Sequence, residues 1–110
     1  MNKIEKRNVT IVKLEGSILE SDCKNLDSSL SKILIESSRN TIIDLTDVNH
    51  ICSLALGLLV SFKKKYSEKN GDIRLVIIDD DMLELFEITM LNKVFEIFSD
   101  VKTAENSFEH

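Results

Sequence analysis

Ser53 is the residue of this 110-residue chain whose type and position best suit regulated chemistry. A short apolar run, Thr41–Leu45, is followed by a mixed segment, Thr46–Cys52, and then by apolar residues at helical spacing. A helix start leaves about four backbone N–H groups unpaired and carries a partial positive charge, so it accommodates an anion. Ser53 could be only the N-cap of that helix. Alternatively, its hydroxyl could accept a phosphoryl group, which would add roughly −1.5 to −2 charges there.

His50 and Cys52 are the only histidine and cysteine that lie close together in the sequence. A thiol beside an imidazole is one design for a nucleophile, but no third group is evident that would orient the imidazole. We therefore interpret the two as a loop histidine and a free thiol, with a small enzyme that uses Cys52 as an alternative. Cys23 and Cys52 are too few for a disulfide framework and too far apart for a zinc pattern, so both are predicted to be reduced.

The three consecutive aspartates Asp79–Asp81 could suggest a site for a hard cation such as calcium or magnesium. Consecutive residues at a helix start seldom converge on one ion, so helix capping is the preferred interpretation. Glycine-rich phosphate-binding loops are absent. A phosphoaspartate receiver would need an acidic pair after the first strand, which Glu15-Gly16 does not supply. We predict no catalytic residues, no metal and no cofactor.

The composition is that of a soluble globular domain, with 43% hydrophobic and 30% charged residues. Lysine and arginine number 14 against 19 acidic residues, for a net charge of −5, which argues against nucleic acid and anionic membranes as partners. No apolar run is long enough for a membrane span, and the first residues lack the pattern of a secretory signal. The sequence therefore predicts a cytoplasmic single domain over residues 1–110, with its core at about 8–108.

Strand-like and helix-like segments alternate along the chain, which indicates an α/β fold with right-handed crossovers. We expect a mostly parallel sheet of four to five strands with about four helices. The polar segment Thr46–Cys52 is predicted to be a loop, and Glu15-Gly16 a turn. The expected elements are an edge strand near Ile4, a strand at Val9–Leu14, a helix from Ser21 to between Ser37 and Asn40, a strand at Thr41–Leu45, a helix from Ser53 that Asn70-Gly71 ends with Gly71 as its left-handed cap, a strand at Ile73–Ile78, a helix at Met82–Met90, a strand at Val94–Phe98, and a helix from Ser99 or Asp100 to about Phe108.

The segment Ile43–Val60, IDLTDVNHICSLALGLLV, resembles the signature of STAS domains, and more narrowly that of the stand-alone bacterial anti-sigma factor antagonists. Their pattern is an apolar strand with Asp-Leu-Ser, a short loop, and Asp-Ser-Ser/Thr-Gly-Leu-Gly opening a helix. The resemblance continues through Gly71 and the strand and helix that follow, and it covers about residues 8–108. It implies a STAS-like single domain.

The serine that accepts phosphate in that family falls on Ser53. Asp44, Leu56 and Gly57 match the pattern, whereas Cys52 stands in place of an aspartate. Leu54 and Ala55 replace a second hydroxyl residue and a glycine. The resemblance thus implies phosphorylation at Ser53 and a partner-binding surface, which would comprise Asp44, Asp47, Cys52, Ser53, Leu54 and Gly57.

The resemblance also implies a mechanism. The unphosphorylated antagonist would bind an anti-sigma factor that is also a serine protein kinase, and so release a sigma factor. The kinase would phosphorylate Ser53 with ATP, and a PP2C-type phosphatase would reset it. The new charge would weaken the interface, and the nearby Asp44 and Asp47 would add to the repulsion. The alternative is a constitutive STAS scaffold in which Ser53 is only a cap.

Overall fold

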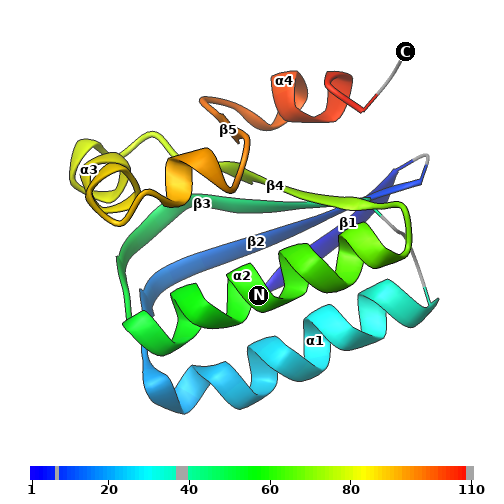
Figure 1. The fold of residues 1–110 in the computed structure, drawn as a ribbon, viewed down its shortest axis with the longest axis horizontal. Helices are drawn as coiled ribbons and strands as arrows, with labels where there is room; N and C mark the ends of the chain where they lie inside the picture. The colour runs from blue at the N-terminus through cyan, green and yellow to red at the C-terminus, as the bar shows by residue number, and fades with distance from the viewer. Residues whose placement is uncertain (7, 37–39, 109–110) are drawn as a thin grey trace.

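Five strands form one sheet in which the order in space follows the order in the chain (Figure 1). This computed structural model describes residues 1–6, 8–36 and 40–108. The first strand pairs antiparallel with the second, and the remaining pairs are parallel, which confirms the predicted fold and its edge strand near Ile4. The strands are β1 (Asn2–Lys6), β2 (Val9–Ile18), β3 (Asn40–Ile51), β4 (Asp72–Val76) and β5 (Ile97–Phe98).

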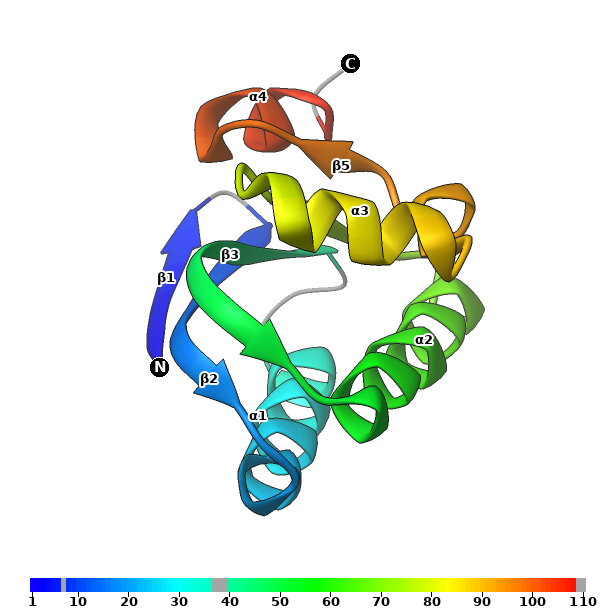
Figure 2. The same ribbon diagram turned by 90° about the vertical axis from the view of Figure 1, so that its left-hand side faces the viewer.

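The helices cover both faces of this sheet (Figure 2). They are α1 (Cys23–Glu36), α2 (Ser53–Glu68), α3 (Asp80–Ile88) and α4 (Val101–Asn106), with the short 3-10 turns η1 (Glu20–Asp22) and η2 (Leu91–Lys93). α1 and α2 lie side by side on one face because each has an apolar stripe at spacings of three and four. The buried residues of these stripes are Cys23, Leu26, Leu30 and Ile33 on α1, and Ala55, Leu56, Leu59, Phe62 and Tyr66 on α2.

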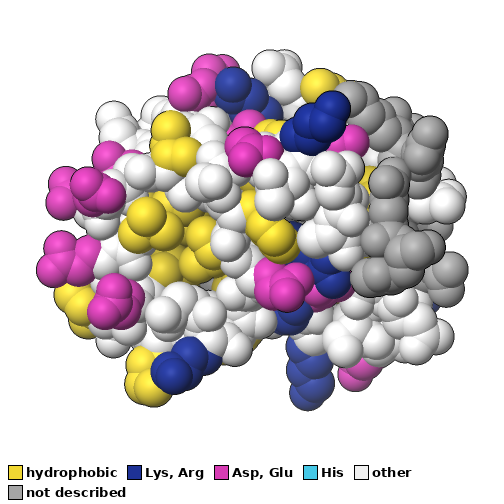
Figure 3. All heavy atoms as spheres, turned by 90° about the horizontal axis from the view of Figure 1, so that it is seen from above, with side chains coloured by type: hydrophobic (Ala, Val, Ile, Leu, Met, Phe, Trp, Pro, Cys, Tyr) yellow, Lys and Arg dark blue, Asp and Glu magenta, His cyan; other side chains and the backbone are white. Residues whose placement is uncertain are grey.

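The opposite face of the sheet carries a smaller core that α4 covers. Ala104 of α4 is fully buried there among apolar side chains of β2, β3 and β4, and Phe98 and Phe108 pack at its margin. Figure 3 views the molecule from this side and shows acidic side chains gathered at the end where α3 lies, beside a hydrophobic patch. The exposed acids of α3 are Asp80, Asp81, Glu84 and Glu87.

Arg74 of β4 connects the sheet to the C-terminal segment. Its Nε lies 3.0 Å from an oxygen of Asp72 and 3.0 Å from one of Glu96. Its Nη1 donates to the Ser107 hydroxyl at 2.6 Å, and the guanidinium stacks 4.0 Å from the centre of the Phe108 ring. One side chain therefore ties β5 and α4 to β4, which compensates for a last strand of only two paired residues.

β2 and β3 are longer than the sequence predicted. The expected loop Thr46–Cys52 is extended strand up to Ile51, and the expected turn at Glu15-Gly16 lies inside β2. The pairing register shifts twice, and each time β3 carries one extra residue. Gly16 has a φ of 75°, which suits the second irregularity and accounts for a glycine that looked like a turn. The extra residues also hid the alternation that marks a strand, since Val48 and Ile51 are buried three positions apart.

Two predicted helix caps were wrong. Cys52, not Ser53, is the N-cap of α2, and Asn70 rather than Gly71 takes the left-handed conformation beyond its end, with φ 62°. Asparagine tolerates this region, and the Gly71 N–H then bonds back to the Tyr66 carbonyl oxygen at 2.8 Å.

The later elements mostly follow the prediction. Asp79 caps α3 as expected, Asp100 caps α4, and the last strand is shorter than predicted because η2 and a loop precede Ile97. α1 begins at Cys23, after a 3-10 turn in which Asp22 accepts from the Leu19 N–H. α1 is described up to Glu36, and its predicted end between Ser37 and Asn40 falls on a stretch of which residues 37–39 lie outside the described part of the chain.

Candidate functional site

The first turn of α2 presents Ser53 to solvent. Ser53 is the first helical residue and is exposed, and the cap position before it belongs to Cys52, whose sulfur accepts a hydrogen bond from the Ala55 N–H at 3.4 Å. Among the described residues, none hydrogen-bonds the Ser53 hydroxyl. Because the cysteine does the capping, the serine oxygen is free for chemistry at the positive end of a four-turn helix.

A groove of about 600 Å³ runs between α1 and α2, with Ser53 on its wall. Leu54 is 56% exposed in this wall, which is unusual for an apolar side chain of its size. Gly57 lies one turn further, and a Cβ placed on it would meet no atom within 4 Å, so packing does not require glycine there. The lining residues are Cys23, Lys24 and Asp27 of α1 and Ser53, Leu54, Gly57, Leu58 and Ser61 of α2.

Lys24 and Asp27 were not singled out from the sequence. They stand three residues apart on the side of α1 that faces the groove, and the Asp27 carboxylate accepts from the Ser31 hydroxyl at 3.3 Å. The exposed Lys24 is the cation of the groove wall, and α2 itself contributes no acid to its own first turn. These residues could be found only by knowing that α1 packs beside α2. Helical periodicity in the sequence shows that each helix is amphipathic, but not which helices pack together.

Asp44 and Asp47 are set apart from this surface. Asp44 is only 6% exposed, and its carboxylate accepts from the Thr46 N–H at 3.0 Å, so it shapes the irregular part of β3. Asp47 is exposed and forms an ion pair with Lys13 at 3.0 Å. Neither acid lines the groove that contains Ser53.

Cys23 and Cys52, separated by 29 positions, are neighbours in space. Their sulfur atoms lie 3.9 Å apart, both thiols being free, where the first residue of α1 meets the cap of α2. Cys23 is buried, and burial together with the hydrogen bond to Cys52 raises the pKa of its thiol. The sulfur of Cys52 bonds to the Ala55 N–H and contacts Cys23, and the exposed His50 lies in the last part of β3.

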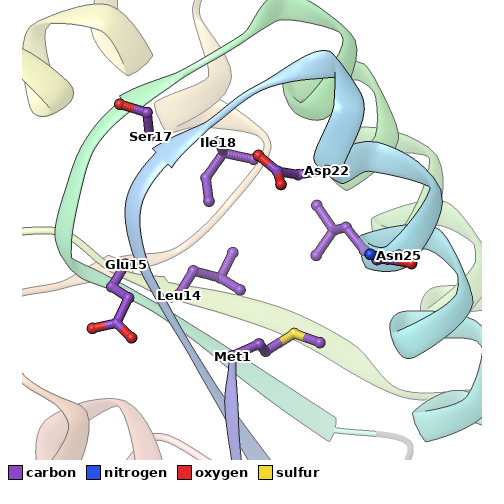
Figure 4. Close-up of a pocket in the computed structure, with 8 residues that line it drawn as sticks. Met1, Leu14, Glu15, Ser17, Ile18, Asp22 and Asn25 are labelled. Atoms are coloured by element: carbon purple, nitrogen blue, oxygen red, sulfur yellow. The ribbon is translucent and has the colours of Figure 1, made fainter.

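A second cavity, of about 240 Å³, lies between the end of β2 and the start of α1. Figure 4 shows Met1 and Leu14 lining it together with polar groups such as Asp22 and Asn25. The Asp22 carboxylate is already engaged by the Leu19 N–H at 2.8 Å. This cavity shares no lining residue with the groove that contains Ser53.

In the described part of the chain, no three histidine, cysteine, aspartate or glutamate side chains are grouped so as to hold a metal ion. The residues Asp79–Asp81 act at the start of α3, where Asp79 accepts from the Met82 N–H at 2.9 Å. No described helix is long and apolar enough to cross a membrane.

Comparison with known proteins decides the family. A STAS domain profile matches residues 1–104. The chain belongs to the STAS domain family. This confirms the resemblance that the junction Ile43–Val60 indicated, and the five-stranded sheet is the fold of that family.

Relatives of this STAS domain carry names that agree with one another. One relative is BtrV of Bordetella bronchiseptica, by its name a candidate anti-sigma factor antagonist. It is 22% identical to this chain over 109 residues, and the match covers 99% of this chain and 92% of BtrV. The anti-sigma-B factor antagonist of Listeria monocytogenes is 36% identical over 55 residues, which cover 50% of this chain and 48% of that protein.

Solved structures of the anti-sigma factor antagonist SpoIIAA share the fold. The unphosphorylated form has a TM-score of 0.83 at 12% identity and covers 96% of this chain and 93% of its own. The phosphorylated form of the Bacillus protein has a TM-score of 0.76 at 12% identity, with coverage of 96% and 97%.

Proposed function

We propose that this STAS domain is an anti-sigma factor antagonist that is switched by phosphorylation of Ser53. In this proposal it acts by binding and not by catalysis. The unphosphorylated protein binds an anti-sigma factor that is also a serine kinase, and a sigma factor is thereby released. Relatives named as antagonists support the class of partner. The observation that carries the proposal is the exposed, unengaged Ser53 hydroxyl at the head of α2.

The partner-binding surface is proposed to be the wall of the α1–α2 groove around Ser53, Leu54 and Gly57, with Cys52 behind it. Leu54 supplies exposed apolar area, which is worth about 25 cal/mol per Å² when a partner covers it. Gly57 leaves room for a side chain of the partner. Asp44, which is buried, supports this surface through β3, and Asp47 stands outside it.

Phosphorylation would act on binding and not on folding. Transfer forms a bond between Ser53 Oγ and the γ-phosphorus of ATP, releases ADP, and passes the hydroxyl proton to a base of the kinase. At the first position of α2 the product is favoured by the helix dipole, and Lys24 across the groove offers a cation. The same two charges are costly inside an interface that covers Leu54, because they lose solvation there. A PP2C-type phosphatase would restore the hydroxyl.

The test is binding of each purified anti-sigma factor kinase of the source organism to the native protein and to Ser53→Asp. We expect the substitution to weaken binding at least tenfold. Ser28→Asp is the matched control, because residue 28 is exposed on α1 outside the groove and the charge change is the same. It should bind like the native protein.

Incubation with kinase and ATP, followed by mass spectrometric mapping, should then place phosphate on Ser53. If phosphate never appears there while a kinase still binds, the switch is wrong and the constitutive scaffold stands. If no anti-sigma factor binds, the proposed class of partner is wrong.

A further inference from the structure

We propose that Cys23 and Cys52 form a reversible intramolecular disulfide that controls the start of α2. Formation of this disulfide does not depend on Ser53, whereas its effect on regulation rests on the function proposed above. The two sulfurs lie 3.9 Å apart and are reduced, so a movement of about 2 Å would bring them to the bond length of a disulfide.

Both cysteines are held at the same end of β2. The Cys52 N–H donates to the Ile18 carbonyl oxygen at 2.9 Å, which fixes the backbone in front of Ser53. The Cys23 thiol donates to the Leu19 carbonyl oxygen at 3.6 Å, which aims its sulfur at the same place. Two adjacent carbonyl groups thus hold the backbone of Cys52 and the thiol of Cys23, and little conformational freedom is lost when the two sulfurs join.

The burial of the two thiols assigns their roles. Cys52 is partly exposed at the start of α2, where an oxidant can reach it. Cys23 is only 7% exposed, and the desolvation that raises its pKa keeps it protonated until it attacks. Cys52 is therefore the thiol that reacts first, and Cys23 is the resolving thiol.

With hydrogen peroxide as the oxidant the reaction balances in two steps. The Cys52 thiolate attacks one peroxide oxygen, the O–O bond breaks, one water leaves after proton transfer, and Cys52 becomes a sulfenic acid. The Cys23 sulfur then attacks the sulfur of Cys52, the S–O bond breaks, and a second water leaves. The two thiols lose two electrons in total, and one peroxide is reduced to two waters. A dithiol reductant reverses the change by thiol–disulfide exchange.

The disulfide would alter the first turn of α2. The sulfur that accepts from the Ala55 N–H is drawn toward α1, and Cys23 gives up its bond to the Leu19 carbonyl oxygen. The groove wall between Cys23 and Ser53 is then covalently fixed. A kinase has to bring the Ser53 oxygen into line with the γ-phosphate, and an error of about 1 Å in such a geometry costs up to a hundredfold in rate. Oxidation should therefore slow phosphorylation of Ser53 about tenfold or more.

The first experiment is oxidation of the reduced protein by hydrogen peroxide, followed by intact mass and peptide mapping. We expect a loss of about 2 Da, a peptide that joins Cys23 to Cys52, and reversal by dithiothreitol. The disulfide should form about tenfold faster in the native protein than in urea, because only the fold holds the thiols together. In Cys23→Ser, Cys52 should stop at a sulfenic acid that dimedone traps, whereas Cys52→Ser should give no such adduct at Cys23.

Intermolecular dimers, or a rate of disulfide formation equal to that in urea, would overturn the assignment of an intramolecular pair.

The second experiment compares the rate of Ser53 phosphorylation before and after treatment with peroxide. It is done on the native protein, on Cys23→Ser and on Cys52→Ser, and each treated protein is compared with its own untreated sample. Only the native protein should slow on oxidation, and equal rates would overturn the regulatory role. If no kinase modifies Ser53 even in the reduced protein, the proposed function fails, while the mass and rate measurements still decide whether the disulfide forms.

Discussion

The Tyr66 hydroxyl donates a 3.3 Å hydrogen bond to the Leu30 carbonyl oxygen, and this joins α2 to α1 inside the core. The same hydroxyl accepts from Thr41 at 3.1 Å, so it also anchors β3. Three elements thus meet at one buried oxygen. The groove that carries Ser53 depends on this arrangement, because its two walls are the two helices that Tyr66 connects.

Tyr66→Phe should lower the free energy of unfolding by about 1–2 kcal/mol, since the Thr41 hydroxyl and the Leu30 oxygen lose a buried partner. The substitution should also change how the free energy of unfolding depends on pH in alkaline solution. Burial raises the pKa of Tyr66, so above about pH 10 the unfolded chain releases this proton before the folded one does and stability falls. Urea unfolding at neutral pH and at alkaline pH should show that slope in the native protein and a shallower one in Tyr66→Phe.

Gly57→Ala should raise the stability of the domain and weaken its binding to the proposed partner. The new methyl group meets open space, and alanine is a better helix former by about 0.8–1 kcal/mol, so the variant should be more stable to urea by that order. The groove becomes narrower at the same place, so affinity for the proposed partner should fall. Gly57→Leu should weaken binding further. Unchanged binding by both variants would remove Gly57 from the partner surface.

Most elements of the fold could be predicted from periodicity and capping residues. The stripes on α1 and α2 and the caps at Asp79 and Asp100 obey local rules, so they were visible in the sequence. The far half of β3 was missed because two extra residues break its alternation, and only pairing with β2 makes it a strand. That pairing is a long-range effect that no local window contains.

The sequence predicts where the site lies along the chain, but not which residues lie beside it in space. The position of Ser53 at the head of α2 follows from local spacing, whereas its partners across the groove come from α1. Serine is the better capping residue, so local rules predict Ser53 as the cap, whereas in the structure the Cys52 sulfur has that role. The contact of Cys52 with Cys23 spans 29 positions and depends on the packing of two helices, so no local sequence pattern predicts it.

Arg74→Met should loosen the C-terminal segment more than the rest of the fold. The substitution keeps the stem but removes the bonds to Asp72, Glu96 and Ser107, and it should cost about 1–2 kcal/mol of global stability. Hydrogen exchange should accelerate in α4 and β5 before it does in α1 or α2. Lys102→Met, at an exposed position of α4, removes the same charge and should leave exchange nearly unchanged. Uniform acceleration across the chain would contradict the role of Arg74 as a local tie.

Acid should destabilise the first turn of α4, because Asp100 caps that turn and does so best as an ionised carboxylate. The Thr103 N–H donates to Asp100 at 2.7 Å and the Thr103 hydroxyl donates at 2.9 Å, and these bonds lower the pKa of Asp100. A depressed pKa in the folded state means that the stabilisation is complete above the unfolded value of about 4 and disappears as pH falls through the folded value. The Thr103 amide resonance, followed by NMR from pH 6 to pH 2, should titrate with a midpoint below the ordinary aspartate value, and the protection of this amide from exchange, relative to an unfolded chain at the same pH, should fall there. Asp100→Asn keeps a side-chain acceptor without the charge, so the shift should vanish, and a midpoint at or above 4 in the native protein would contradict this account.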